Sequence, residues 1–297
     1  MDQLGIVARF ATWLAANRLR RVVFIAAFFP IIGLGLLSAA TVVMDAQLRG
    51  PRDTAQDCLM ALAILAGIAL LTGSDVMLLG VSAALSWLLW LLLGSLAGRA
   101  GSLTLAVQAA VLLALVGMAV FIGLVDDPVA YWSEMLETAY ANFAEQGFDV
   151  SGEVDVAAQA ALMSGVVVAG SLTSSIVALL LGSSWASAVQ GGSYGEQFRS
   201  LRLGYFIGGL AALAGLASIF GLQLSGLLLV FGAAFMFQGM AVTAWWSHRR
   251  NWPRGWWVGL CILPALLVDL AVVIGVLFAA IGFIDNWYGL RRSFDRT

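Results

Sequence analysis

Residues 102–124 read SLTLAVQAAVLLALVGMAVFIGL, a run of apolar and small residues without a single charged side chain. At the 1.5 Å rise of an α-helix, a run of this length covers the roughly 30 Å of hydrocarbon in a bilayer. Hydrocarbon offers the backbone no hydrogen-bond partners, so a helix is the expected conformation. This stretch therefore predicts a transmembrane helix and indicates the class of the whole chain.

Similar runs recur from one end of the chain to the other. Hydrophobic residues make up 61% of the 297 residues and charged residues 11%. We predict an all-α, polytopic transmembrane bundle of about eight segments, folded as one membrane domain over 1–297. The candidate segments are 22–43, 57–72, 76–97, 102–124, 157–183, 203–222, 226–247 and 256–284.

Composition also argues against several classes of function. The net charge of −2 gives no reason to expect a nucleic-acid partner. His248 is the only histidine, and Cys58 and Cys261 both lie in apolar runs. A zinc site or histidine-based catalysis would have almost no ligands, and P-loop, HExxH and GxSxG motifs are absent. We expect no catalytic residues, no metal and no cofactor, and hence a protein that is not an enzyme.

The first apolar run contains a helix breaker. Pro30 interrupts 22–43 and is followed by Gly33 and Gly35. Proline within a helix removes a backbone hydrogen bond, so this segment is predicted to be broken or to form a hairpin. The residues before it, 1–21, predict an interfacial helix with Ile6 and Phe10 on one face.

The longest polar stretch, 125–156, carries eight acidic residues and neither Lys nor Arg. Apolar side chains at helical spacing within it predict an amphipathic helix near 129–144, lying on the membrane surface. Two interpretations are open: a solvated connector with one docked face, or a lid over a site.

Basic residues tend to stay on the cytoplasmic side of a membrane protein. If the Pro30 region enters and returns on the cytoplasmic side, twelve of the fifteen basic residues lie inside and only Arg291, Arg292 and Arg296 lie outside. A break in the last run would bring this tail inside too. Under either variant, 125–156 is an acidic extracytoplasmic connector.

Ionisable and amide side chains in or beside the apolar runs are candidate functional residues, because burying them in lipid costs free energy. Asp269 is predicted to lie mid-membrane, where it could bind a cation, take a proton or pair with an arginine. The other candidates are Glu196, Arg199 and Arg202 before an apolar run, Asp285 and Arg291 at the end of the last one, and Gln238 within another. For Glu196 to Arg202 the alternatives are an ion-paired helix start and an anion or partner contact. Asp285 and Arg291 could pair, and Gln238 could line a cavity or bond across helices.

Four features of the chain resemble the YybS-like uncharacterised bacterial membrane proteins. They are the Pro30 run, the loop Leu48-Arg-Gly-Pro51, the stretch Gly195-Glu-Gln-Phe-Arg-Ser-Leu-Arg-Leu-Gly204 with Phe237-Gln-Gly239 after it, and Ile284-Asp-Asn-Trp-Tyr-Gly-Leu-Arg291. That family is distantly similar to the substrate-binding S components of energy-coupling-factor transporters. The resemblance implies solute binding or transport and names no solute.

Two functions from different classes follow. The first is a small-solute binding or transport protein resembling an S component, and the alternative is a non-transporting membrane scaffold or assembly partner. The expected partners are membrane lipids, a small-molecule solute and another membrane protein, in the bacterial cytoplasmic (inner) membrane. A polar cavity containing Asp269 or the glutamines would favour the first function, and a solid core with an exposed face of small residues would favour the second.

Overall fold

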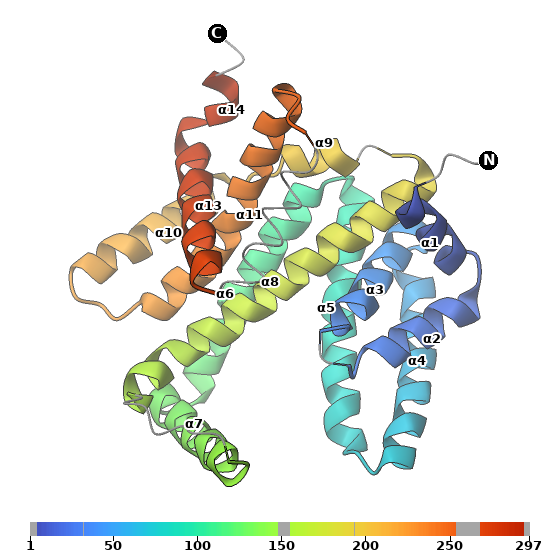
Figure 1. Cartoon of the computed structure of the whole chain (residues 1–297), viewed down its shortest axis with the longest axis horizontal. Helices are drawn as coiled ribbons and strands as arrows, with labels where there is room; N and C mark the ends of the chain where they lie inside the picture. Colours follow the sequence, from blue (N-terminus) through green and yellow to red (C-terminus); the bar gives the residue numbers. More distant parts are fainter. Residues whose placement is uncertain (1–4, 32, 148–154, 193, 254–267, 294–297) are drawn as a thin grey trace. The chain divides into compact units, whose positions relative to one another are not determined.

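A computed structural model gives the fold and describes residues 5–31, 33–147, 155–192, 194–253 and 268–293. Every regular element in these residues is a helix, which confirms the all-α prediction (Figure 1). The chain folds into two compact units. Unit 1 comprises residues 1–110 and 174–202, and unit 2 comprises 111–173 and 203–297.

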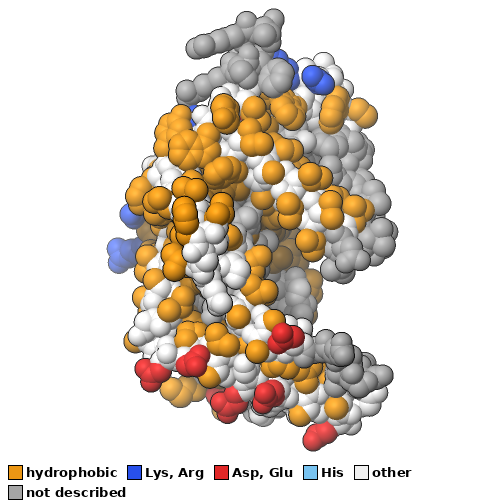
Figure 2. Space-filling view, turned by 90° about the vertical axis from the view of Figure 1, so that its left-hand side faces the viewer, with side chains coloured by type: hydrophobic (Ala, Val, Ile, Leu, Met, Phe, Trp, Pro, Cys, Tyr) orange, Lys and Arg blue, Asp and Glu red, His pale blue; other side chains and the backbone are white. Residues whose placement is uncertain are grey.

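Within the described residues, six helices are long and apolar enough to cross a bilayer. This establishes a multi-pass membrane protein, but the predicted number of eight segments is wrong. The six are Pro51–Thr72, Val76–Ala100, Leu103–Leu124, Val156–Gln190, Ser225–Arg249 and Leu270–Tyr288. Hydrophobic side chains cover most of the described surface in Figure 2, as expected of a surface that meets lipid.

Two predicted segments fall short of a full crossing. The run 22–43 is divided between α2 (Arg18–Phe28) and α3 (Gly35–Arg49). The run 203–222 forms only α10 (Gly204–Ile219), which is about 24 Å long and ends before a turn at Gly221, where φ is +90°. Mean hydropathy detects such segments but does not measure the uninterrupted length of the helix.

The predicted break at Pro30 is confirmed. Helices α2 and α3 pack against each other, and the Ser38 hydroxyl of α3 donates a 2.8 Å hydrogen bond to the Ile25 carbonyl of α2. The two helices are about 16 and 22 Å long, shorter than the hydrocarbon layer. They form a hairpin that can return to the side it started from.

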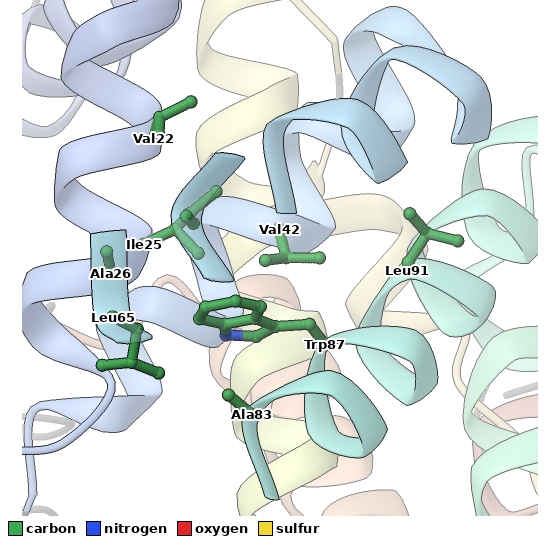
Figure 3. Close-up of a cluster of buried hydrophobic side chains, with 9 residues drawn as sticks. Val22, Ile25, Ala26, Val42, Leu65, Ala83, Trp87 and Leu91 are labelled. Atoms are coloured by element: carbon green, nitrogen blue, oxygen red, sulfur yellow. The ribbon is translucent and has the colours of Figure 1, made fainter. Parts of the chain in front are cut away.

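The core of unit 1 gathers around this hairpin. Trp87 of α5 (Val76–Ala100) is 2% exposed and packs with Val42 of α3 and Leu65 of α4 (Pro51–Thr72) (Figure 3). The Trp87 indole N–H donates to Ser38 at 3.2 Å, so the polar end of the ring is satisfied inside an apolar cluster.

The predicted N-terminal helix is α1 (Ile6–Ala15), and the chain breaks at Asn17 before α2. Ala11 and Leu14 are fully buried against Trp185 and Ala186 of α8 (Val156–Gln190). One face of α1 is therefore part of the core of unit 1, while Ile6 on another face is 86% exposed.

In unit 2, α11 (Ser225–Arg249) and α13 (Val268–Tyr288) run in the same direction (Figure 1). Phe235 of α11 lies beside Gly282 of α13. Three residues further along both helices, Gln238 of α11 bonds Asp285 of α13. Helix α13 therefore ends on the side of unit 2 where α11 ends.

Glycines allow α11 and α13 to pack closely. A Cβ on Gly239 would come within 1.9 Å of the Phe278 carbonyl oxygen, and one on Gly282 within 2.1 Å of the Phe235 oxygen. Small residues permit such backbone contact between membrane helices.

The helix predicted near 129–144 is present as α7 (Pro128–Glu145), between α6 (Leu103–Leu124) and α8. Asp127 caps it, accepting hydrogen bonds from the Val129 and Ala130 N–H groups at 3.0 Å each. None of its residues is buried. The other short helices are α9 (Tyr194–Arg199) and α14 (Leu290–Ser293).

Candidate functional site

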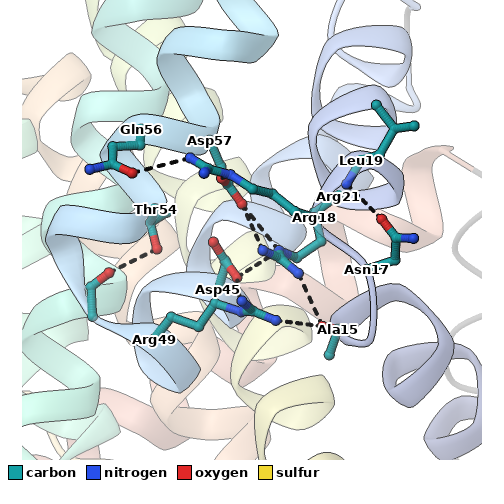
Figure 4. Close-up of polar contacts among 11 residues, drawn as sticks. Ala15, Asn17, Arg18, Leu19, Arg21, Asp45, Arg49, Thr54, Gln56 and Asp57 are labelled. Carbon is teal, nitrogen blue, oxygen red and sulfur yellow. Dashed lines mark hydrogen bonds and ion pairs between the residues drawn. The ribbon is translucent and has the colours of Figure 1, made fainter.

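A cluster of charged side chains is buried in unit 1, where α1 and α3 end and α2 and α4 begin (Figure 4). Arg21 at its centre is 1% exposed. Its Nη2 donates to Asp57 Oδ2 at 2.9 Å, and its Nε lies 2.9 Å from Asp45 Oδ1. Asp45 and Asp57 are themselves almost fully buried. One guanidinium therefore joins carboxylates from α3 and α4.

Two further arginines surround this pair of carboxylates. Arg18 Nε lies 2.5 Å from Asp57 Oδ1, and Arg49 Nε lies 3.2 Å from Asp45 Oδ1. Arg21 Nη1 and Arg49 Nη2 both donate to the Ala15 carbonyl, at 3.0 and 2.7 Å. The two guanidinium groups also interact favourably with the negative, C-terminal end of the α1 dipole. The cluster thereby joins α1 to the α2–α3 hairpin and to α4.

Our sequence prediction missed this cluster. Asp45 and Arg49 have the i, i+4 spacing of a helical ion pair, which was the available signal. The pairing of Arg21 with Asp57 could not be found in this way, because 36 residues separate them. The ion pairs and hydrogen bonds of the cluster connect α1, α2, α3 and α4, and so they stabilise the packing of these four helices.

In unit 2 the structure brings together three of the predicted residues: Gln238, Asp285 and Arg291. Arg291 Nη2 donates to Asp285 Oδ2 at 2.7 Å, which confirms the predicted pairing. Gln238 Nε2 donates to the same oxygen at 2.9 Å. Gln238 is fully buried and bonds across helices, the second of the two roles considered for it.

The same network forms hydrogen bonds with backbone groups that have no partner within a helix. Residues 201–203 are not helical, and Leu201 and Leu203 are buried. The Leu203 N–H donates to Gln238 Oε1 at 2.9 Å, and Asn286 bonds both the N–H and the carbonyl of Gly204, at 2.9 and 3.0 Å. In a lipid environment such groups must find partners inside the protein. The amides thus allow the chain to break before α10.

The stretch containing Glu196, Arg199 and Arg202 lies in unit 1. Glu196 and Arg199 belong to α9, and the Arg199 guanidinium lies over Gly195, where a Cβ would come within 2.9 Å of Nη1. The Arg202 carbonyl accepts a 3.0 Å hydrogen bond from Gln108 Nε2.

Asp269 is the second residue of α13, in the first turn of that helix. Its side chain lies outside the described residues, so its pairing remains a prediction.

A cavity of about 330 Å³ lies in unit 2 beside the start of α7. Its size is at the lower end of the range for small-molecule sites. The lining is mostly apolar and comes from α6, α7, α8, the turn before α11 and the start of α11: Leu115, Met118, Ala119, Ile122, Pro128, Val129, Ala161, Ser164, Gly165, Gln223, Leu224, Gly226 and Leu227. Neither Gln238 nor any charged residue is part of this lining.

Close packing and one polar contact define the walls of this cavity. Gly165 of α8 and Gly226 of α11 touch through their backbones, since a Cβ on Gly165 would lie 2.2 Å from the Gly226 Cα. The Trp132 indole of α7 donates to Ser164 at 2.8 Å, which holds α7 beside α8. In Figure 2 acidic side chains gather at the level of α7, and Asp126 and Asp127 directly precede the Pro128 that lines the cavity.

Within the described part of the chain, no group of three or more His, Cys, Asp or Glu side chains could hold a metal ion. Comparisons with protein-family models, with curated proteins and with solved structures find no match to this chain.

Proposed function

We propose that this membrane protein binds a small, largely apolar solute in the cavity beside α7 and serves its transport. The cavity carries the proposal: it combines an apolar lining with the hydroxyl of Ser164 and the amide of Gln223. Ligand sites typically have such a composition, in which a few polar groups orient a mainly apolar molecule. The two aspartates beside Pro128 favour a solute with a neutral or positively charged end over an anion.

The proposal places the solute away from the residues that sequence analysis favoured. Gln238 and Asp285 bond each other, Leu203 and Arg291, so their polar atoms serve the fold. Pro128 and Val129 at the start of α7 line one side of the cavity, and the contact between Trp132 and Ser164 anchors this helix, which supports the lid interpretation. Solute binding is also what the resemblance to YybS-like proteins and S components implies.

We place the protein in the bacterial cytoplasmic membrane, with α7 and the cavity mouth outside. Support comes from the hairpin α2–α3 and from the common direction of α11 and α13. With both features, all fifteen basic residues fall on one side and the acidic connector 125–156 on the other. This distribution satisfies the positive-inside rule better than the twelve-to-three division.

Native mass spectrometry of the protein in nanodiscs tests solute binding. Ala119→Phe adds a ring to the cavity wall, and Val120→Phe adds the same ring one residue away, where the side chain is 52% exposed and does not line the cavity. We expect the wild type and Val120→Phe to retain a small molecule that is not a lipid, and Ala119→Phe to lose it at unchanged thermal stability. Lipids alone on all three proteins would overturn the proposal and favour the scaffold alternative.

Topology is tested by cysteine labelling in intact cells, in a background without Cys58 and Cys261. Glu145→Cys, on the exposed end of α7, should react with a membrane-impermeant thiol reagent. Arg250→Cys, after the end of α11, should react only after lysis. The reverse pattern would invert the proposed orientation.

A further inference from the structure

A second hollow, of about 220 Å³, lies in unit 1 between α4 and α5. Cys58, Leu59 and Leu62 line it from α4, and Trp87, Leu88 and Leu91 line it from α5. All six side chains are apolar or weakly polar. Figure 3 shows Trp87 and Leu91 on the α5 side of this region. We call this hollow the α4–α5 groove.

The α4–α5 groove follows the helix axes. Helices α4 and α5 are joined by a turn of three residues, 73–75, and so run antiparallel. The lining on α4 extends from Ala55 to Leu62, which is about 10 Å along the axis. One leaflet of a bilayer contributes roughly 15 Å of hydrocarbon. The α4–α5 groove therefore covers much of one leaflet, on the side where α4 begins and α5 ends.

An arginine stands at that end of each helix. Arg52 precedes Ala55 by three residues and Leu59 by seven, so the three lie near one face of α4. Arg99 follows Leu88 by eleven residues, about three turns along the same face of α5. Both arginines are exposed, and neither forms an ion pair with a described residue.

This arrangement differs from that of the neighbouring arginines. Arg18, Arg21 and Arg49 are engaged with Asp45 and Asp57. The guanidinium N–H groups of Arg52 and Arg99 are therefore available to bind a group outside the protein. An apolar slot with two cations at one end matches an amphiphile with an aliphatic chain and an anionic head.

We propose that one acyl chain of an anionic phospholipid lies in the α4–α5 groove, with its phosphate bound by Arg52 and Arg99. The lipid belongs to the leaflet on the arginine-rich side, where anionic headgroups attract basic residues. Its chain covers Leu59 and Leu88, the lining residues of the α4–α5 groove that are 67% and 53% exposed. This site is independent of the solute cavity, since it lies in the other unit.

The experiment is native mass spectrometry after reconstitution in vesicles of equal parts phosphatidylglycerol and phosphatidylcholine. We expect the wild type to retain one phosphatidylglycerol in preference to phosphatidylcholine. The double variant Arg52→Ala/Arg99→Ala should lose this preference roughly thirty-fold, because each arginine near an anionic surface raises the affinity by a factor of about five. Arg250→Ala, which removes a charge from unit 2, should keep the preference.

A second pair of variants separates the groove from the charges. Leu59→Trp fills the α4–α5 groove and should abolish retention of either lipid, whereas Leu70→Trp, at a position on α4 that is 73% exposed and outside the groove, should not. Equal retention on Leu59→Trp and the wild type would overturn the acyl-chain site. An unchanged preference in the double arginine variant would overturn the headgroup contact.

Discussion

In each of the two units an arginine pairs with a buried carboxylate, but the groups around the pair differ. In unit 1 Arg21 joins Asp45 and Asp57, and two more arginines complete a cluster of charges between helix ends. In unit 2 Asp285 and Arg291 are accompanied by the amides of Gln238 and Asn286, which bond the backbone of Leu203 and Gly204. The first network joins separate helices, and the second serves a break in the chain.

This difference has energetic consequences. Removing one partner from a buried ion pair leaves an uncompensated charge, which costs more than the loss of a neutral hydrogen bond. Variants of the two units should therefore fall in a definite order of stability.

The largest effect is expected from Asp57→Ala in unit 1. It leaves Arg21 buried with one carboxylate fewer, and breaking a buried pair in this way typically costs about 3–5 kcal/mol. Thermal unfolding of the purified protein in detergent measures the loss, with the exposed Asp53→Ala on the same helix as control. Equal unfolding temperatures for the two variants would contradict a stabilising role for the cluster.

Gly239→Ala tests the close packing of unit 2, where no charge is involved. Its Cβ would meet the Phe278 carbonyl at 1.9 Å, so α11 and α13 would have to separate. Overpacking of this kind costs about 1–3 kcal/mol. Gly232→Ala on the same helix has open space around its Cβ and should unfold at the wild-type temperature or slightly above it. A loss of similar size in both variants would indicate a general effect of alanine in α11.

Asn286→Ala tests the amides that serve the chain break. It removes both hydrogen bonds to Gly204, and hydrogen bonds between membrane helices contribute about 1–2 kcal/mol. Hydrogen exchange of the Gly204 amide, read by mass spectrometry, should become faster along with a lower unfolding temperature. Gln190→Ala, at the exposed end of α8, provides the control. Unchanged exchange at Gly204 would show that the break is held by other groups.

The smallest effect is expected from Arg18→Ala, which compares the contributions of Arg18 and Arg21 to the cluster of unit 1. Arg18 shares Asp57 with Arg21, but its side chain is 48% exposed. Exposed pairs contribute about 0–1 kcal/mol, and Asp57 keeps its bond to Arg21. When unfolding is measured at increasing salt concentrations, the difference in unfolding free energy between wild type and variant should stay within this range. A loss as large as that of Asp57→Ala would mean that Arg18, and not Arg21, holds the cluster.

The apolar runs predicted most of the fold because lipid imposes the same requirement on every crossing segment. Helix-breaking residues were equally informative, since Pro30 indicated the division between α2 and α3. The failure at 203–222 has a physical cause: the side chains are apolar throughout, but the non-helical residues 201–203 and the turn at Gly221 shorten the helix. Composition carries no record of these backbone conformations.

The candidate residues divide in the same way. Asp285 and Arg291 could be paired from their spacing, because only six residues separate them at the end of α13. Asp45 and Asp57 were missed, since their common partner Arg21 reaches them through the fold and not through the sequence. The cavity beside α7 was equally invisible, because its lining comes from four separate stretches of apolar residues.

The hairpin of α2 and α3 also bears on how the chain enters the membrane during synthesis. Its connection, Phe29 to Leu34, carries no charge, whereas Arg18 to Arg21 and Arg49 to Arg52 flank its two ends. A hairpin of this kind can insert tip first, and no guanidinium has to be carried through the hydrocarbon, which would cost about 2.5–3.5 kcal/mol each on insertion scales. Insertion of α2 and α3 as such a hairpin would require no translocation of the preceding residues, and it would leave both ends of the hairpin on the side from which it inserted.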